Sequence, residues 1–476
     1  MADKDLKVNI SEFVLINYSR EYAIDIKRLC SQFNLYQDLF SSVMTFTATI
    51  NDSNGLLERF PMIGEEIVGI SFKNRDETKK EITKVFNVYR VSNRNSEQER
   101  KESFVIHGIS YEARVDMVSS VDRSFAGATF SDMVESVYDE HFVNGKLKHG
   151  LQFENRYQAE IKNIDIEETY GTHSVVPPLS TPFEFFKYCA RQAQSPKYIE
   201  SDFVFYEDID GFNFKTISSL IDTDPVEDYY LADATKETPA VRQYKIIRNL
   251  EYASSEFDAI KSQKAGMYDN NVSVIDPVLK IYKEQPFNYH FRKNRDNAFM
   301  GLGSDGFTSE YSAERSFDGG SHSRFMIGNI SDGAYRDVSY ISGRTIDVHG
   351  NILDSVAHWP FSRYRYLNYT ISKMAQLNTK IILKVTISGD VNRKVGEVIR
   401  VFVPQKSASE EYKQRYNLFY GEDDPRFIIT GIKHSYSFAE DIFTTTMEVV
   451  KDSLGQPLVQ TQRYREVEQT SNFSLL

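Results

Sequence analysis

The chain has 476 residues, a formal net charge of −12 and 41% hydrophobic residues, so it is long enough for about three domains with full cores. Its acidic balance argues against a protein that coats nucleic acid, because such proteins carry clustered Lys and Arg. The two cysteines exclude a disulfide framework, and the lack of a long apolar segment predicts a polypeptide made in a cytosol that does not span a membrane by itself.

Residues 6–115 are predicted to form a β-sandwich or barrel, because short strands alternate with turns about every eight to twelve positions. Val43 to Ile50 has the apolar, Thr-rich pattern of a strand, and a polar turn follows it. Pro61 then ends a short helical turn, and Gly64 redirects the chain into a strand from Glu66 to Phe72. We therefore expect Pro61 and Gly64 to be structural residues of a first barrel.

Two features of this region recur near the C-terminus. A Gly-Glu segment before a strand occurs as Gly64-Glu65-Glu66-Ile67 and again as Gly396-Glu397-Val398-Ile399. A strand pair occurs as Phe86 to Val91 with Phe104 to Ile109, and again as Phe427 to Ile432 with Thr445 to Val450. Chance similarity of two ordinary hairpins competes with duplication of a barrel module, and the equal spacing inside the two pairs favours duplication. Glu65, Gly396 and Glu397 are accordingly predicted structural residues.

An α+β domain is predicted at about 116–236, where two helices have clear start signals. Thr129 can cap the first helix, with Asp132 three residues later, and the helix is expected to reach Phe142. The segment Thr181 to Glu184 supplies the second cap, a proline at the first helical position and the acidic residue of a capping box. The domain therefore separates the first barrel from the second β region.

A hairpin follows, in which Phe203 to Tyr206 and Phe212 to Phe214 flank the turn Asp208-Ile209-Asp210-Gly211. The two aspartates of this turn are spaced as at the start of a calcium loop. The segment 213–219 lacks the carboxylate that a twelve-residue calcium loop requires, so a tight turn with Gly211 as a structural residue is favoured.

The second barrel is predicted in two pieces, 237–285 and 362–454. Between them, 286–361 is rich in Gly and Ser, interleaves Arg with aromatic residues, and is interpreted as a loop-rich insertion. A helix at about 363–377 leads into the second piece. The tail, 455–476, is polar with apolar residues at its end, and we expect it to order on a binding partner.

No motif for catalysis, a cofactor or a metal stands out. Gly301 to Gly306 fits GxGxxG, but neither the preceding strand nor the following helix of a nucleotide site is predicted around it. The nine histidines form no HExxH, GxSxG is absent, and Cys30 and Cys189 lie in no recognisable nucleophile setting. The sequence thus predicts no catalytic, cofactor-binding or metal-binding residues and no cofactor.

Several segments carry a resemblance, in the same order along the chain. They are 51–67 (NDSNGLLERFPMIGEEI), 123–142 (RSFAGATFSDMVESVYDEHF), 181–193 (TPFEFFKYCARQA), 201–217 (SDFVFYEDIDGFNFKTI), 387–404 (ISGDVNRKVGEVIRVFVP) and 427–437 (FIITGIKHSYS). Together they resemble baseplate hub proteins of contractile-tailed, T-even-like bacteriophages, and the N-terminal tube half of type VI secretion spike proteins. The insertion 286–361 and the tail have no counterpart in this resemblance.

The resemblance implies a β-rich α+β fold, with two similar β-barrel tube domains, an intervening α+β domain and a loop-rich insertion. It implies a structural hub in the virion baseplate, and not an enzyme. The hub would be assembled in the host cytoplasm and would join the hexameric tail tube to the trimeric central spike. Three copies would place six barrels in a ring, whose acidic lumen would let genome DNA pass without specific binding. The implied partners are the central spike, a tail tube or tube-initiator protein, and neighbouring baseplate proteins.

Two alternatives stay open on the sequence. One is a cell-wall hydrolase whose active site lies in the insertion 286–361. The other is a type VI secretion spike component, for which a long C-terminal β-helix would be expected. The duplicated barrels favour the structural hub.

Overall fold

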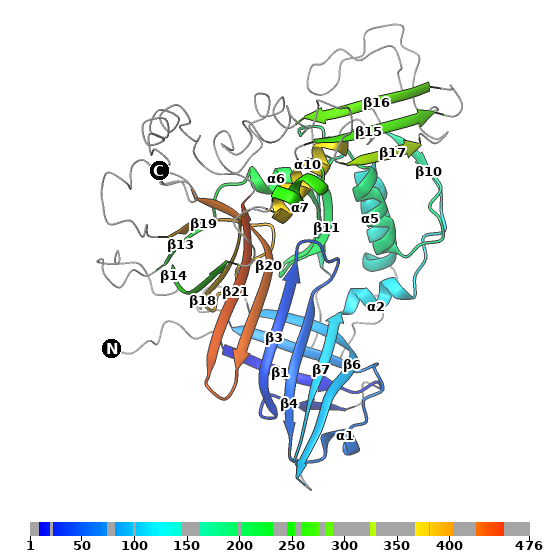
Figure 1. The fold of residues 1–476 in the computed structure, drawn as a ribbon. Coiled ribbons are helices and arrows are strands. Elements are labelled where there is room, and N and C mark those ends of the chain that lie inside the picture. Colours follow the sequence, from blue (N-terminus) through cyan, green and yellow to red (C-terminus); the bar gives the residue numbers. More distant parts are fainter. Residues whose placement is uncertain are drawn as a thin grey trace, which may run out of the picture.

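The computed structural model of the chain describes residues 9–19, 22–73, 81–98, 101–144, 162–198, 201–231, 245–252, 259–267, 269–276, 281–288, 324–329, 367–379, 381–403 and 425–451. Figure 1 shows a β-rich molecule in which two strand-built units lie next to each other and most helices lie outside them. One thirteen-stranded sheet runs through both units. The predicted β-rich α+β fold class is confirmed. Among the helices of the described ranges, none has both the length and the apolarity needed to cross a membrane.

The first unit is a barrel-like sheet with the strand order β3-β4-β7-β6-β5-β1. Its elements are β1 (Asn9–Ile16), β2 (Ala23–Asp25), β3 (Cys30–Asp38), β4 (Thr45–Asp52), α1 (Leu56–Arg59), β5 (Ile67–Lys73), β6 (Ile82–Gln98) and β7 (Lys101–Ser110). Every second residue of β4 from Phe46 onward is buried, which is the period of a strand with one face in a core. The Phe46 ring packs between Phe33 and Phe86, at centroid distances of 5.7 and 4.9 Å.

The second unit is a closed six-stranded barrel. Its strands are β13 (Glu227–Leu231), β14 (Ile246–Tyr252), β18 (Ile381–Ser388), β19 (Val398–Phe402), β20 (Arg426–Ser437) and β21 (Ile442–Lys451). They are ordered β19-β13-β14-β18-β21-β20, and a β19–β20 pairing closes the ring. The buried aliphatic residues of these strands fill its interior. The two barrels therefore have separate cores within one continuous sheet.

The two barrels share most of one topology. β3, β4, β5, β6 and β7 correspond to β14, β18, β19, β20 and β21, and these strands form the same antiparallel pairings. The first strands differ: β1 lies antiparallel to β5, whereas β13 lies parallel to β19 and also pairs with β14. The correspondence extends to β-bulges. β6 pairs Val88 with Gly108 and then bulges, and β20 pairs Ile429 with Val449, at the same sequence offset, and also bulges. A second bulge occurs at the same place in β3 and β14. It lies between Cys30 and Gln32 in β3, and between Ile247 and Asn249 in β14. The similarity of the two barrels, predicted from their hairpins, is confirmed.

In the structure, the two Gly-Glu segments correspond with a shift of one residue relative to the alignment of their sequences. The Glu66 carbonyl accepts a hydrogen bond from the Val88 amide, at 2.9 Å, and the Glu397 carbonyl accepts one from the Ile429 amide, also at 2.9 Å. Since Val88 and Ile429 occupy the same place in their barrels, Glu66 corresponds to Glu397. Matching by sequence alone pairs Glu397 with Glu65, because the letters Gly-Glu align there.

The α+β part lies between the barrels in sequence. It contains α2 (Tyr111–Met117), β8 (Phe125–Ala128), α3 (Phe130–Tyr138), the π-helical turn η2 (Asp139–Val143), β9 (Asn163–Ile166), β10 (His173–Val175), α5 (Pro182–Gln192), β11 (Phe203–Glu207), β12 (Gly211–Thr216) and α6 (Ile217–Ile221). Both predicted capping boxes form, at Thr129 with Asp132 and at Thr181 with Glu184. β11 and β12 form the predicted hairpin. A cluster of aromatic rings from α3, α5 and this hairpin makes the core.

The strand pairing differs from the predicted domain boundaries in two places. β13, at Glu227–Leu231, already belongs to the second barrel, which therefore begins before residue 237. β15 (Asp269–Asp276) and β16 (Ile281–Asn288) lie outside that barrel, in a separate sheet with β17 (Phe325–Asn329). This sheet packs against α10 (Leu367–Thr379), the helix predicted near 363–377, and α10 in turn contacts α7 (Ala259–Lys264). Most of 286–361, including Gly301 to Gly306, and the tail 455–476 lie outside the described residues.

Candidate functional site

The strongest candidate for a working surface is the junction where the two barrels meet. There, β3 of the first barrel pairs antiparallel with the C-terminal half of β20, from Asp38 opposite Gly431 to Gln32 opposite Ser437. We call this pairing the barrel seam. β20 can form it because its first residues pair with β19 and its later residues extend beyond β19. One long strand thus belongs to both barrels.

One face of the barrel seam is polar. The Ser435 hydroxyl donates to Asn34 Oδ1 at 2.7 Å, and Gln32 Nε2 donates to the same serine at 3.2 Å. On this face the Lys433 ammonium lies 5.9 Å from the centre of the Tyr36 ring, within the range of a cation–π contact. These cross-strand contacts add to the backbone ladder and define its register.

The other face of the barrel seam is buried and contains an imidazole. His434 is 1% exposed. Its Nε2 lies 3.3 Å from Gln37 Nε2 and its Nδ1 lies 3.0 Å from Thr445 Oγ1. Burial lowers the pKa of His434 to about 4, which outweighs the raising effect of Asp390. The imidazole is therefore neutral at pH 7.

The barrel seam is expected to weaken in acid. Because the folded pKa of His434 lies below the unfolded value of about 6.5, the unfolded chain binds the extra proton first. Stability is therefore lost as pH falls from about 6.5 towards 4, by up to about 3 kcal/mol from this group. Urea unfolding at pH 7 and pH 4.5 should show a smaller pH difference for His434→Gln than for the native chain. His107→Gln is the comparison: its ring is less buried, and burial lowers the pKa of His107 less strongly, so this variant should show a smaller effect of the same sign. An unchanged pH difference in His434→Gln would contradict the assignment.

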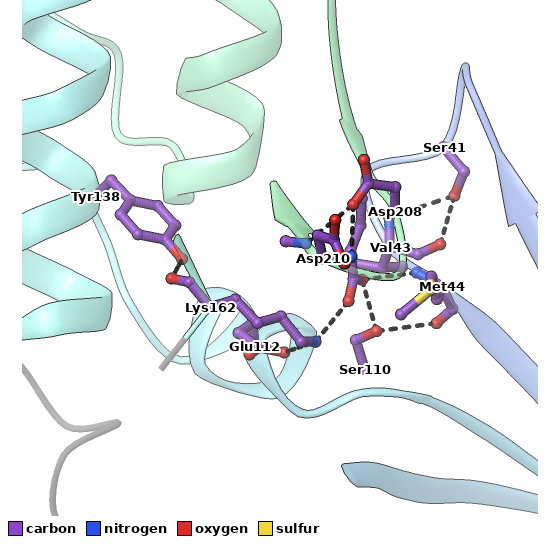
Figure 2. A network of polar contacts seen from close by, with 11 residues as sticks. Ser41, Val43, Met44, Ser110, Glu112, Tyr138, Lys162, Asp208 and Asp210 are labelled. Carbon is purple, nitrogen blue, oxygen red and sulfur yellow. Dashed lines mark hydrogen bonds and ion pairs between the residues drawn. The ribbon is translucent and has the colours of Figure 1, made fainter. Parts of the chain in front are cut away.

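A second feature is a buried charge cluster where the first barrel meets the α+β part (Figure 2). It consists of Glu112 on α2, Lys162 before β9 and Glu207 at the end of β11, with side chains 3%, 10% and 0% exposed. Lys162 Nζ donates to Glu112 Oε2 at 2.6 Å and to Glu207 Oε1. We call these three residues the anchor cluster.

The anchor cluster contacts the first barrel through the carboxylate of Glu207. Glu207 Oε2 accepts hydrogen bonds from the Met44 amide, at 2.7 Å, and from the Ser110 hydroxyl, at 2.6 Å. Met44 precedes β4 and Ser110 ends β7, so one side chain fastens two barrel strands to the hairpin. Both Glu207 oxygens already have donors, so this carboxylate is poorly suited to proton transfer. The geometry favours a structural role over acid–base catalysis.

The charges in and around the anchor cluster influence one another. Burial alone would lower the pKa of Lys162, but attraction to Glu112 and Glu207 outweighs burial and raises it. Lys84 on β6 is also buried, and burial together with repulsion from Lys162 lowers its pKa to about 8. Glu112 and Glu207 therefore keep Lys162 charged, whereas the neighbouring Lys84 loses its proton more readily.

The predicted structural residues of the first barrel lie in the loop before β5. Gly64 has a φ of +93°, as expected for a residue that redirects the chain. Glu65 is exposed and forms an ion pair of 3.2 Å with Arg114 on α2. Glu66 closes the loop, since its carboxylate accepts from the Ile63 and Gly64 amides at 2.8 and 2.9 Å. Pro61 is exposed in the same loop. Sequence reasoning therefore selected Glu65 where the loop depends on Glu66.

The equivalent loop of the second barrel packs against the α+β part. Gly396 has a φ of +85°, and Glu397 accepts from the Lys394 amide at 3.2 Å while Arg393 lies 3.2 Å away. Burial raises the pKa of Glu397 in spite of Arg393. The Lys394 ammonium forms an ion pair with Asp210 in the hairpin turn. This loop therefore links the second barrel to the hairpin.

Gly211 has a steric role in the hairpin. A Cβ there would lie 2.4 Å from the Asn163 carbonyl oxygen of the paired strand β9, so only glycine fits. Asp208 organises the turn, because its Oδ1 accepts from the amides of Asp210 and Gly211 at 2.7 and 3.0 Å. Its other oxygen accepts from Asn213 at 2.9 Å. The turn thus uses the Asp208 carboxylate internally, as the hairpin interpretation expected.

Sequence reasoning missed the anchor cluster and His434. A signal existed for Glu207, because it ends an aromatic strand (FVFYE) in which a charge needs a buried partner. Glu112 and Lys162 lie about fifty residues apart and carry no such signal. Within the described ranges, no group of three or more His, Cys, Asp or Glu side chains is placed to hold a metal ion.

No family model and no curated protein matches the chain. Among solved structures, a tail protein from Neisseria meningitidis is 10% identical, with a TM-score of 0.49, over 94% of this chain and 98% of its own. A 43 kDa prophage tail protein from Shewanella oneidensis is 10% identical, with a TM-score of 0.49, over 93% and 99%. An Escherichia coli type VI secretion component is 10% identical, with a TM-score of 0.40, over 94% and 77%. The three neighbours are thus a tail protein, a prophage tail protein and a type VI secretion component.

Proposed function

We propose that this chain is a structural hub of a contractile phage tail baseplate, located in the virion, and that three copies join the tail tube to the central spike. One observation carries the proposal: a single chain contains two barrels with the same strand order and the same bulges. Three such chains supply six similar barrels, which matches a sixfold tube, while the complex keeps the threefold symmetry of a spike. The resemblance of the sequence to baseplate hubs supports the same role.

The proposed ring has a channel through which the genome passes. The chain carries 68 acidic and 56 basic residues, and a wall with excess carboxylates would repel phosphate rather than hold DNA. The proposed partners are the spike, a tube or tube-initiator protein and neighbouring baseplate proteins. The role requires no catalysis, which agrees with the saturated hydrogen bonding of Glu207 in the anchor cluster.

The assembly is tested by mass and symmetry. Light scattering of the full chain, alone and co-expressed with the spike protein of the same virus, should give three copies per particle. Electron microscopy should show a ring of six barrels with true threefold symmetry. A particle with one or two copies in the presence of the spike, or a lumen lined mainly by Lys and Arg, would contradict the proposal. A peptidoglycan zymogram of the purified chain should show no clearing.

A further inference from the structure

The barrel seam pairs an edge of β20 with an edge of β3. The chain has a second pair of strand edges, equivalent to these two, outside the seam. Within one chain, the part of β20 that extends beyond β19 pairs with β3. By the duplication, the equivalent edges are the part of β6 beyond β5 and the edge of β14. β5 pairs with β6 as far as Asn87, and β13 pairs with β14 only at Ile246 and Ile247. In the described ranges, no strand covers the outer edge of β6 after Val88 or that of β14 after Ile247.

Both edges are placed for contact with another molecule. Figure 1 shows β14 on the left side of the molecule and β6 on the right, with β20 and β3 next to each other between them. Tyr89 on β6 and Tyr252 on β14 are 53% and 47% exposed, and tyrosine is enriched in protein interfaces. A long exposed strand edge is an aggregation hazard unless a specific partner covers it.

We propose that β6 of one copy pairs antiparallel with β14 of the next copy, and so repeats between chains the barrel seam that joins the two barrels within a chain. The inference rests on the proposed function, because it specifies the contact that would join the three hubs. The contact is head-to-tail, and a head-to-tail contact forms a ring when its rotation closes. The occupant of each edge is a second copy of this chain.

The barrel seam also defines the register of this contact. On β7, Ser103 pairs with Asn95, and at the same sequence offset Thr444 of β21 pairs with Ser435. Asn95 therefore takes the place of Ser435. Over this stretch β6 has one residue more than β20. A bulge between Ser92 and Asn95, where Asn93 has a φ of 52°, accommodates the extra residue.

The partner position on β14 follows in the same way. Asn34 of β3 pairs with Thr47, and Glu251 of β14 pairs with Lys384, at corresponding places of β4 and β18. Glu251 therefore takes the place of Asn34. The hydrogen bond from Ser435 to Asn34, 2.7 Å long within the chain, becomes a bond from the Asn95 amide to the Glu251 carboxylate of the next copy.

The charges fit this register. Arg94, next to Asn95, has a side chain that is 55% exposed and is oriented by two hydrogen bonds to Glu102, at 3.0 and 3.1 Å. Arg90 is exposed on the same half of β6. Glu251 is exposed on β14, so it would meet a basic segment. Opposite charges on facing strands stabilise the pairing and disfavour incorrect registers.

Disulfide trapping in the full chain tests the contact. The two native thiols, Cys30 and Cys189, are buried, so introduced cysteines react selectively. The double variant Asn95→Cys with Glu251→Cys should form linked chains on oxidation, because facing residues of paired strands bring their Cβ atoms within disulfide reach. Because the disulfide is covalent, linked chains accumulate even when the contact between copies is weak. The control pair, Asn95→Cys with Lys384→Cys, places the second thiol one strand further from the edge and should link less.

Three outcomes would overturn the inference. Equal linking of the control pair, or of single variants, would mean random collision. Trimers by mass without linking of the test pair would refute this contact while leaving the proposed function intact. A chain that neither links nor forms trimers with the spike would refute both. A charge test is independent of cysteines: in the native-thiol background, Arg94→Glu should reduce trimer mass, and adding Glu251→Arg to that variant should restore it.

Discussion

Lys162→Met is expected to lower the free energy of unfolding by about 3 to 5 kcal/mol, the cost of leaving buried charges without their partner. The variant removes the ammonium that Glu112 and Glu207 share, while those side chains stay 3% and 0% exposed. The methionine replaces the aliphatic part of the lysine, so little packing is lost. Chemical denaturation at pH 7 measures the change, and the docking of the first barrel on the α+β part should loosen first.

A matched control and a rescue define this prediction. Lys197 forms an ion pair with Asp222, but the two side chains are 67% and 57% exposed. Lys197→Met should therefore change the free energy of unfolding far less than Lys162→Met does. Adding Glu112→Gln and Glu207→Gln to Lys162→Met should recover part of the loss, because the amides remain acceptors without a buried charge. Similar losses at Lys162 and Lys197 would contradict the burial argument.

Gly396→Val is expected to be far more damaging than Gly64→Val, although both glycines have positive φ. Each substitution forces a β-branched residue into a backbone region that costs about 1 to 2 kcal/mol or more. At Gly64 a Cβ meets nothing within 4 Å. At Gly396 a Cβ lies 2.8 Å from Tyr206 Oη and 3.2 Å from Leu220 Cδ1, which adds about 1 to 3 kcal/mol of overpacking.

Soluble yield and melting temperature of the four variants Gly64→Ala, Gly64→Val, Gly396→Ala and Gly396→Val measure this difference. The alanine pair separates backbone strain from side-chain bulk, since both alanines carry the strain and neither is β-branched. Gly396→Ala should already be less stable than Gly64→Ala, because the Cβ alone makes the close contact with Tyr206. Equal stability of the two alanine variants would show that the second barrel does not pack on the hairpin there.

Much of the fold is predictable because its signals are short. The capping boxes at Thr129 and Thr181 need only four neighbouring residues, and both form. The β11–β12 hairpin follows from one turn sequence. The duplication is visible in the sequence because the two strands of each hairpin are separated by the same number of residues. By contrast, the sheet of β15, β16 and β17 joins segments far apart in the chain, so assigning 237–285 to the barrel was wrong for β15 and β16.

By itself, the sequence determined the elements whose causes are local: alternating strands, capped helices, the Asp208 turn and two hairpins of equal spacing. Only the tertiary structure decided which carboxylates would be buried together, because Glu112, Lys162 and Glu207 meet across chain separations that no periodicity encodes. It also decided that Glu66, not Glu65, matches Glu397, since backbone hydrogen bonds define equivalence where letters are ambiguous. The barrel seam belongs to the same class: β3 and β20 are about four hundred residues apart, and edge pairing follows from which strands extend beyond their neighbours.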